Sequence, residues 1–293
     1  MVQKDRTSQI IMNIFMIFLV LCCVIPFLLM IMASFTDEAT LGKNGYNLFP
    51  EKFSLETYEY IFRSASTIFT GYGMTILVTV IGTTLNILMT VLFAYPLSRR
   101  DLPGRGFLSF FLFFTMLFNG GLVPTYMMYA NTFHINNTIW ALIVPNLRMN
   151  AFYVIMMRSY FTASIPESLI EAAKLDGASE TRVLWKIVIP LSKPMMVTLI
   201  LMVGLNYWND WVNGLYYVSD QRLYTIQLIL NNMISNINFL SQNASLFGAT
   251  VIKLPTIGIR MGIAVIAVLP VMIIYPFLQK YFVKGIVIGG VKG

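Results

Sequence analysis

Charged residues are scarce in this sequence. Asp, Glu, Lys and Arg make up 11% of the 293 residues, while hydrophobic residues make up 57%. Roughly a quarter of the residues in soluble domains are charged, and the mean hydropathy of +0.72 places the chain outside that class. The shortage of charge argues against a large soluble domain and indicates a protein whose main solvent is lipid.

Histidine and cysteine are almost missing as well. The chain has one histidine, His134, and two adjacent cysteines, Cys22 and Cys23. Neighbouring positions point to different sides of a helix, so these thiols predict neither a structural disulfide nor a metal site. The remaining ligands are too few for a zinc or haem centre, and no acid/base pair favours a membrane-embedded enzyme.

A phosphate-binding loop is the third absence. The sequence contains no G-x-x-x-x-G-K-[ST] motif, in which glycines and a lysine hold the phosphates of ATP. The glycine-rich end, residues 285–293, has a lysine at 292 but neither the spacing nor a following hydroxyl. We therefore expect that this chain does not hydrolyse ATP alone and binds no cofactor or metal of its own.

Long apolar runs are what the sequence does have. A helix needs about 20 apolar residues to span the hydrocarbon core, and six runs reach that length: 10–33, 73–97, 106–129, 138–161, 191–212 and 257–282. The first run is long for a signal peptide and lacks a small-residue cleavage site, so we retain it as a span. The predicted fold is an all-α, polytopic membrane protein with six transmembrane helices.

Basic residues are unevenly distributed between the connections. Thirteen Lys and Arg residues lie at the N-terminus, in the second and fourth connections and in the tail, against five in the other connections. Cytoplasmic segments carry such an excess, so we predict cytoplasmic termini and an even number of spans, and no nucleic-acid partner. We divide the chain into an N-terminal span and external loop (1–69), a transmembrane domain (70–283) and a cytoplasmic tail (284–293).

A charged, amphipathic segment lies between the fourth and fifth runs. Ser164 and Glu167 have the spacing of a capping box, which predicts a helix starting at the next residue. We expect this helix to stop at Gly177, which accepts the left-handed conformation that a β-carbon resists. Ser179 then caps a second helix that ends at Pro190. The sequence thus predicts two helices joined by a tight turn outside the bilayer.

This helical pair, residues 164–189, has two explanations. The small side chains of Ala172 and Ala173 let a partner surface approach closely, and Glu171 offers a charge at the rim, which suits docking into a groove. Alternatively, the two helices plug the cytoplasmic end of the bundle, which explains the capping and the apolar stripe equally well.

Polar residues inside the fourth run are candidates for a translocation pathway. Arg148 lies between Asn146 and Asn150. An arginine at a helix centre costs about 2.5 to 3.5 kcal/mol on insertion scales, so it should face the bundle interior or water. Two roles stay open there: contact with a sugar hydroxyl or an acidic saccharide, or an ion pair with Asp210 in the fifth run.

The end of the fifth run combines amide, acid and indole groups. The candidates are Asn206, Trp208, Asn209 and Asp210. Aromatic rings stack on sugar C–H surfaces and amides bridge hydroxyls, so this segment suits a saccharide, although tryptophan also gathers at membrane interfaces as an anchor. For the long connection that follows, residues 213–256, sugar contact, partner docking and an idle solvated loop all stay open.

Several motifs resemble one known family. Glu171-Ala172-Ala173, then Gly177, then Ile187 and Ile189-Pro190 are similar to the EAA loop of permease subunits in binding-protein-dependent ABC importers. Four further segments resemble the carbohydrate importer permeases of the MalG type: residues 95–99, 124–126, 277–285 and 291–293. Residues 119–126 resemble more narrowly the LplC-like branch, associated with complex saccharides.

The resemblance implies the rest of an importer in the cell membrane. It implies a heterodimer with a second permease subunit, two cytoplasmic ATPase subunits that bind ATP and Mg, an extracellular solute-binding protein, and an oligosaccharide or related sugar as substrate. It also implies that the EAA loop couples to the ATPase subunits, which rock the permease halves between inward-open and outward-open states. The implied coupling residues are Glu171, Ala172, Ala173, Asp176, Gly177, Ala178, Ile187 and Pro190.

An ion-coupled secondary sugar carrier, working without an ATPase, is the alternative. Such a carrier needs intramembrane carboxylates for ion coupling, and Asp210 alone lies near the bilayer by sequence. The helical pair would have no evident use in a carrier, so the permease interpretation is favoured.

Overall fold

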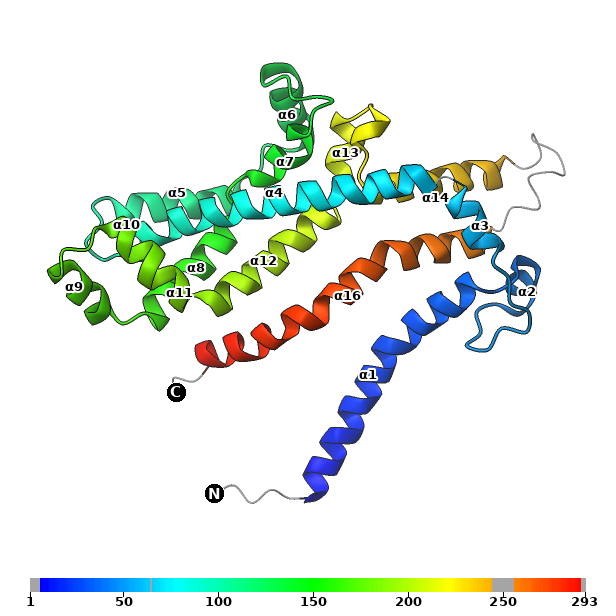
Figure 1. Ribbon diagram of the computed structural model, residues 1–293, viewed down its shortest axis with the longest axis horizontal. Helices are drawn as coiled ribbons and strands as arrows, with labels where there is room; N and C mark the ends of the chain where they lie inside the picture. Colours follow the sequence, from blue (N-terminus) through cyan, green and yellow to red (C-terminus); the bar gives the residue numbers. More distant parts are fainter. Residues whose placement is uncertain (1–5, 64, 244–255, 291–293) are drawn as a thin grey trace. The chain divides into compact units, whose positions relative to one another are not determined.

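The computed structural model describes residues 6–63, 65–243 and 256–290 (Figure 1). The chain consists of two compact units. Unit 1 comprises residues 1–68 and 230–271, and unit 2 comprises residues 69–229 and 272–293. Within the described ranges the regular elements are helices, apart from one isolated antiparallel bridge between Thr36 and Phe53. The predicted all-α class is confirmed.

Unit 1 combines the N-terminal helices with parts of two late ones. Its elements are α1 (Arg6–Ser34), α2 (Glu38–Asn44), α3 (Glu56–Phe62), most of α14 (Ile226–Gln242) and the first part of α16 (Thr256–Gly290). The carboxylate of Glu38 accepts the backbone N–H groups of Ile257 (2.9 Å) and Gly258 (3.0 Å). An anion at this place satisfies orphan donors at the start of α16 and complements the helix dipole.

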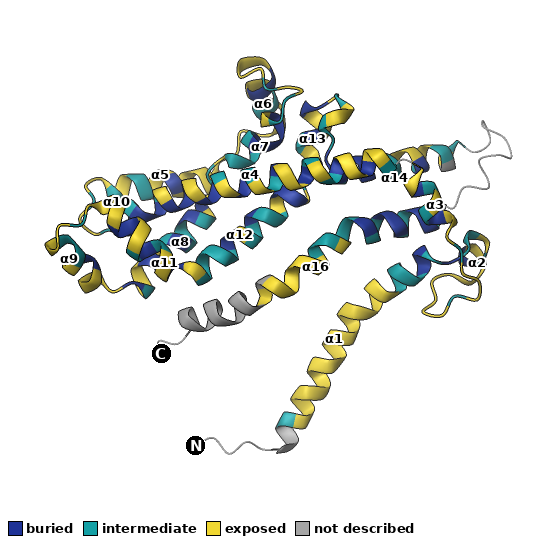
Figure 2. Cartoon of the chain, viewed as in Figure 1, coloured by how far each residue is buried: buried dark blue, intermediate teal, exposed yellow. Residues whose placement is uncertain are grey.

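Helix α1 is apolar on all faces. Residues 10–28 are exposed around the whole helix (Figure 2), and its window of highest hydropathy is 0% buried. A helix with this pattern is typical of a membrane span rather than of a surface helix of a soluble protein.

Unit 2 holds the remaining helices. They are α4 (Ala65–Ser98, whose first four residues belong to unit 1), α5 (Arg105–Leu117), α6 (Leu122–Met127), η1 (Met128–Thr132), α7 (Trp140–Leu147), α8 (Ala151–Ser164), α9 (Glu167–Leu175), α10 (Glu180–Val183), η2 (Leu184–Val188), α11 (Ile189–Leu191), α12 (Lys193–Trp208), α13 (Val212–Tyr217) and η3 (Gln221–Leu223).

Helices α4 and α12 approach closely through glycines. A β-carbon on Gly82 would lie 2.5 Å from the ring of Tyr207, and one on Gly204 would lie 3.7 Å from the Thr83 hydroxyl. The Tyr207 ring is buried, and its hydroxyl donates to the carbonyl of Ile143, 3.1 Å away. Small residues permit such close helix packing in a membrane, so the long helix α4 is fixed against the helix that carries the polar end of the fifth run.

Three helices are long and apolar enough to cross a membrane, and three bent pairs qualify when each pair counts as one span. The straight ones are Gln9–Ser34, Ala65–Ser98 and Ile257–Phe277. The pairs bend by 112° between Arg105–Leu117 and Leu122–Thr132, by 57° between Trp140–Leu147 and Ala151–Ser164, and by 82° between Glu180–Leu191 and Lys193–Trp208. Counted in this way, the described residues contain up to six spans, three of them broken.

The third and fourth apolar runs each contain a break in the helix, a detail that the sequence did not predict. The third run breaks at residues 118–121, where Gly121 adopts φ +83. The fourth breaks at Arg148, which leaves the helical region with ψ 123. Hydropathy measures only whether a residue tolerates lipid, so it does not detect a change of helix direction.

The connection at 213–256 is also more ordered than a loop. It contains the end of α13, η3 and the 17-residue helix α14, while residues 244–255 lie outside the described part. At the C-terminus, α16 continues to Gly290, so the predicted tail begins inside a helix. Residues 291–293 of the resemblance lie outside the described residues.

Candidate functional site

The elbow, defined as α9, the turn at Gly177 and α10, contains the two helices and the turn that the sequence predicts. Gly177 has φ +79. The N–H of Ala178 donates to the carbonyl of Ala173 (2.9 Å), and the N–H of Gly177 donates to the carbonyl of Lys174 (2.9 Å). These two bonds form a Schellman motif, which closes a helix and requires the left-handed residue that glycine supplies.

The start of α10 is capped as predicted, but two other details are wrong. The Ser179 hydroxyl accepts the N–H of Arg182 (3.4 Å). Ser164 instead ends α8, and the backbone is extended at Ile165 and Pro166, so no capping box forms; a residue before proline avoids the helical region. Pro190 does not end the second helix, because the wider π-helical turn of η2 precedes it and α11 continues.

The elbow presents an exposed surface of mixed character. Glu171, Ala172, Asp176 and Gly177 are exposed, and the Leu175 side chain is 89% exposed. The other predicted coupling residues are half-buried, apart from the exposed Pro190: Ala173, Ala178 and Ile187. An exposed apolar side chain surrounded by acidic groups and small residues is typical of a surface that docks a partner. Helices that plugged the cytoplasmic end of the bundle would instead bury this side chain.

Ion pairs tie the elbow to the end of α4. Tyr95, in the last turn of α4, donates its hydroxyl to Glu180 Oε2 (2.6 Å), and Lys174 pairs with Glu180 across the Gly177 turn. Lys174 Nζ also lies 3.8 Å from Asp101 Oδ2, and Arg99 Nε lies 3.4 Å from Asp101 Oδ1. Both helices of the elbow therefore contact the segment where α4 ends.

Asp101 is ionised in this cluster. A hydrogen bond from its own backbone N–H, which outweighs the opposing effect of burial, and the charges of Arg99 and Lys174 hold its pKa below the ordinary value. The ion pairs thus persist at neutral pH.

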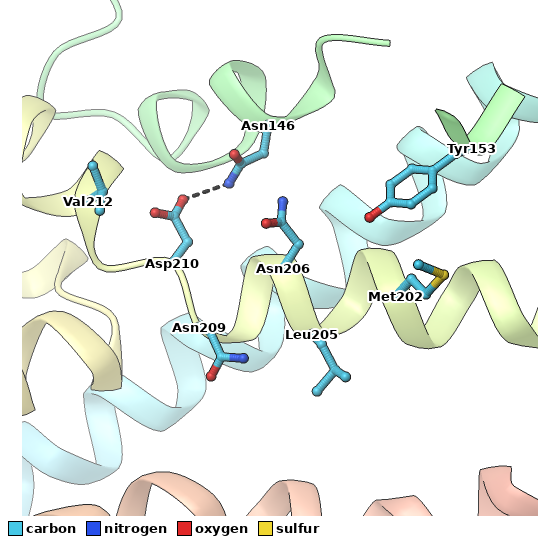
Figure 3. Close-up of a pocket in the computed structure, with 8 residues that line it drawn as sticks. All are labelled: Asn146, Tyr153, Met202, Leu205, Asn206, Asn209, Asp210 and Val212. Carbon is cyan, nitrogen blue, oxygen red and sulfur yellow. Dashed lines mark hydrogen bonds between the residues drawn. The ribbon is translucent and has the colours of Figure 1, made fainter. Parts of the chain in front are cut away.

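A polar pocket of about 430 Å³ lies where α7, α8, α12 and α13 meet. Its lining residues are Asn146, Tyr153, Met202, Leu205, Asn206, Asn209, Asp210 and Val212 (Figure 3). The volume falls within the range of small-molecule sites, about 300 to 1,000 Å³. Four of the seven residues predicted for the pathway lie together here: Asn146, Asn206, Asn209 and Asp210.

Asp210 is held by amide donors. Its Oδ2 accepts the side-chain N–H groups of Asn146 and Asn213, each at 2.6 Å, and its Oδ1 accepts the backbone N–H of Asn213 (3.1 Å). Figure 3 shows Asn146 and Asp210 turned toward each other. Among the described residues no ion pair joins Asp210 to Arg148.

The helix break beside the pocket is supported from α4. The Asn86 side-chain amide donates to the carbonyl of Asn146 (3.1 Å), and the Thr90 hydroxyl lies 3.4 Å from Asn86 Oδ1. A carbonyl released by a broken helix needs such a partner at membrane depth. Asn86 thus stabilises the bend that places Asn146 in the pocket.

The other three predicted pathway residues lie outside the pocket lining. Arg148 is exposed at the end of α7. Asn150 is exposed and caps α8 through the N–H of Phe152 (3.0 Å). Trp208 is buried near Tyr72, with ring centroids 6.3 Å apart.

Sequence reasoning missed Tyr153, Met202, Leu205 and Val212 in the lining and Asn213 as a support. One signal was available: Met202, Leu205, Asn206 and Asn209 recur at the spacing of a single helix face. Tyr153 had no such signal, because it lies beyond the break between α7 and α8.

Apolar helices of membrane-spanning length, a polar pocket between broken helices and an elbow outside them define a multi-pass transport subunit. The family described as "Binding-protein-dependent transport system inner membrane component" matches residues 87–288. The chain belongs to this family and is a permease subunit of a binding-protein-dependent importer.

Curated relatives extend over almost the whole chain. Protein LplC of Bacillus subtilis is 39% identical over 272 residues, covering 92% of this chain and 90% of LplC. The polygalacturonan/rhamnogalacturonan transport system permease protein YtcP of the same species is 37% identical over 290 residues, covering 99% of this chain and all of YtcP.

A solved structure has the same fold. The crystal structure of a bacterial ABC transporter involved in the import of the acidic polysaccharide alginate contains a chain with a TM-score of 0.79 and 28% identity. The match covers 96% of this chain and 99% of that one.

Proposed function

We propose that this chain forms half of the translocation pathway of an ATP-driven oligosaccharide importer. In this proposal it pairs with a second permease subunit, receives the sugar from an extracellular binding protein and couples to two cytoplasmic ATPase subunits through the elbow. Both termini are cytoplasmic, as the distribution of Lys and Arg favours.

The geometry of the elbow is the observation that carries this proposal. A Schellman turn at Gly177 projects α9 with Leu175 exposed, while ion pairs hold its other side against α4. An apolar anchor surrounded by polar groups is the usual composition of a protein–protein contact. ATP binding and hydrolysis are assigned to the partner, because this sequence has no phosphate-binding loop.

An oligosaccharide suits the pocket. Amides of Asn206 and Asn209, the Asn146 carbonyl group and the Tyr153 phenol offer both donors and acceptors. The names of YtcP and of the alginate transporter refer to acidic polysaccharides, and Arg148, exposed in the nearby break, supplies a cation for a sugar carboxylate. We therefore assign Arg148 to substrate contact.

The coupling role is tested by co-purification. Leu175→Asp removes the exposed apolar anchor and is expected to reduce the recovered ATPase subunits by about tenfold or more, the effect of losing an interface hot spot. Phe49→Asp is the matched control, since Phe49 is 88% exposed and lies in the first connection, which belongs to unit 1. Wild-type recovery of the ATPase subunits with Leu175→Asp would contradict the proposal.

A further inference from the structure

The hydroxyl of Tyr95 joins a membrane helix to the elbow. It is a strong contact, because the acceptor is the carboxylate Glu180 at 2.6 Å. The Tyr95 ring is buried, 6% exposed, and packs edge-on against Phe161 with centroids 6.4 Å apart. The ring is therefore fixed by packing, and its hydroxyl is directed at α10.

The elbow is held to the same place from its other helix. Lys174, in the last turn of α9, pairs with Glu180 and lies within 3.8 Å of Asp101, three residues beyond the end of α4. Because Lys174 bridges α9 and α10 as well, the two helices cannot separate from each other or from the end of α4 without breaking an ion pair.

The end of α4 is itself anchored. The Ser98 hydroxyl donates to the Tyr95 carbonyl (2.6 Å), and Arg105 Nε donates to the Leu97 carbonyl (3.0 Å). Such bonds satisfy carbonyls that the last turn of a helix leaves free. The last turn of α4 is thus held in place at the point where the elbow contacts it.

Contacts made by residues earlier in α4 reach the pocket. Asn86, nine residues or about 14 Å before Tyr95 along the helix axis, holds the carbonyl of the pocket residue Asn146. One turn earlier, Gly82 contacts the ring of Tyr207 on α12. A single helix therefore contacts the elbow at one end and, further along, two of the helices that line the pocket, α7 and α12.

We infer that α4 is the element that transmits elbow movement to the pocket, and that Tyr95, Lys174 and Glu180 are positioning residues for this transmission. The inference deepens the proposed function and rests on it. The test therefore measures the coupling between ATP hydrolysis and sugar uptake.

The experiment uses the complete importer in proteoliposomes, with the binding protein and an oligosaccharide, and measures sugar taken up per ATP hydrolysed. Tyr95→Phe deletes the hydroxyl and keeps the packed ring. It should lower this ratio by about three- to tenfold, the range for a partly exposed hydrogen bond to a charged group. Lys174→Met should lower the ratio by a similar factor. Lys174→Arg, which keeps the positive charge, should retain much of the wild-type ratio.

Two further variants separate transmission from general damage. Tyr95→Phe combined with Glu180→Ala should lower the ratio no further than Glu180→Ala alone, because both changes remove the same contact. Tyr160→Phe is the matched control and should leave the ratio unchanged, since its hydroxyl lies 3.5 Å from a backbone carbonyl outside the network.

Three results would overturn the inference: an unchanged ratio with Tyr95→Phe, additive effects in the double variant, or a loss of activity that follows a lowered melting temperature. None of these results contradicts the proposed function as long as Leu175→Asp still releases the ATPase subunits. If Leu175→Asp leaves the complex intact, the proposed function fails first.

Discussion

At the scale of single residues, the pocket depends on amides that hold one another in place. Asp210 accepts three N–H bonds from Asn146 and Asn213, so its charge is used to orient the lining. Carboxylate oxygens that already accept hydrogen bonds have fewer positions left to coordinate a sodium ion. This arrangement favours a structural role for the one acidic residue that the ion-coupled alternative relied on.

The role of Asp210 is tested by two substitutions. Asp210→Ala removes the hydrogen bonds that the half-buried side chains of Asn146 and Asn213 donate to the carboxylate, each worth about 0.5 to 1.5 kcal/mol, so melting temperature and uptake should both fall. Asp210→Asn keeps an acceptor oxygen and should retain most of the uptake. Complete loss of uptake with Asp210→Asn in a stable protein would show that the ionised carboxylate itself is needed.

Arg148 gives a second prediction at this scale. Arg148→Ala should raise the apparent KM for an acidic oligosaccharide by about tenfold, as expected for a lost charge-assisted contact, and should leave the KM for its carboxyl-reduced form unchanged. Arg148→Lys keeps the charge but lacks the planar guanidinium group. Its apparent KM for the acidic oligosaccharide should therefore lie between those of the wild type and of Arg148→Ala. The ATPase subunits should still co-purify; their loss together with uptake would indicate a folding role instead.

The residue types of the site were predictable, but their partners were not. Asn146, Asn206, Asn209 and Asp210 stand out as polar groups in apolar runs, and the structure brings them into one pocket. Asn86 lies 60 residues before Asn146 in the chain. Only the packing of α4 shows that the Asn86 amide donates to the carbonyl of Asn146 at the break between α7 and α8.

At the scale of elements, the close packing of α4 on α12 determines where the pocket wall lies. Gly82→Ala places a methyl group against the buried Tyr207 ring and should destabilise the protein by about 1 to 3 kcal/mol, seen as a lower melting temperature in detergent. Gly73→Ala on the same helix meets open space and should be neutral or slightly stabilising. Equal melting temperatures of the two variants would argue against this helix contact.

The elbow turn gives the corresponding prediction for coupling. Gly177→Asp introduces a β-carbon at φ +79 and a charge on the docking surface, so uptake should be uncoupled from ATP hydrolysis although expression is normal. Gly45→Asp is the control, because Gly45 has φ +70 and equally open surroundings in unit 1. Uptake by Gly177→Asp at the wild-type rate would refute the coupling role of the turn.

The helices of the elbow were predictable because local signals determine them. A glycine past the last turn and a serine before the next helix are sufficient to place the turn. The continuation of the second helix through Pro190 was not predictable, because it depends on the π-helical turn over Leu184–Val188. The sharp bends of the spans depend likewise on tertiary contacts, such as those of Asn86.

At the scale of the whole molecule, composition and the apolar runs were sufficient to predict the class of protein. A charged share of 11% and six apolar runs predicted a multi-pass helical protein, and the family match at residues 87–288 agrees. The grouping of residues 230–271 with the N-terminal 68 in one unit was not apparent from the sequence, since hydropathy carries no information about which spans pack together.

The central claim is that this chain supplies a pathway and a coupling surface while a partner supplies the energy. The most direct measurement is sugar accumulation in proteoliposomes with defined subunits. The complete importer should accumulate sugar only with ATP and the binding protein, and this chain alone should accumulate none on a proton or sodium gradient. Accumulation by the chain alone on either gradient would contradict the account.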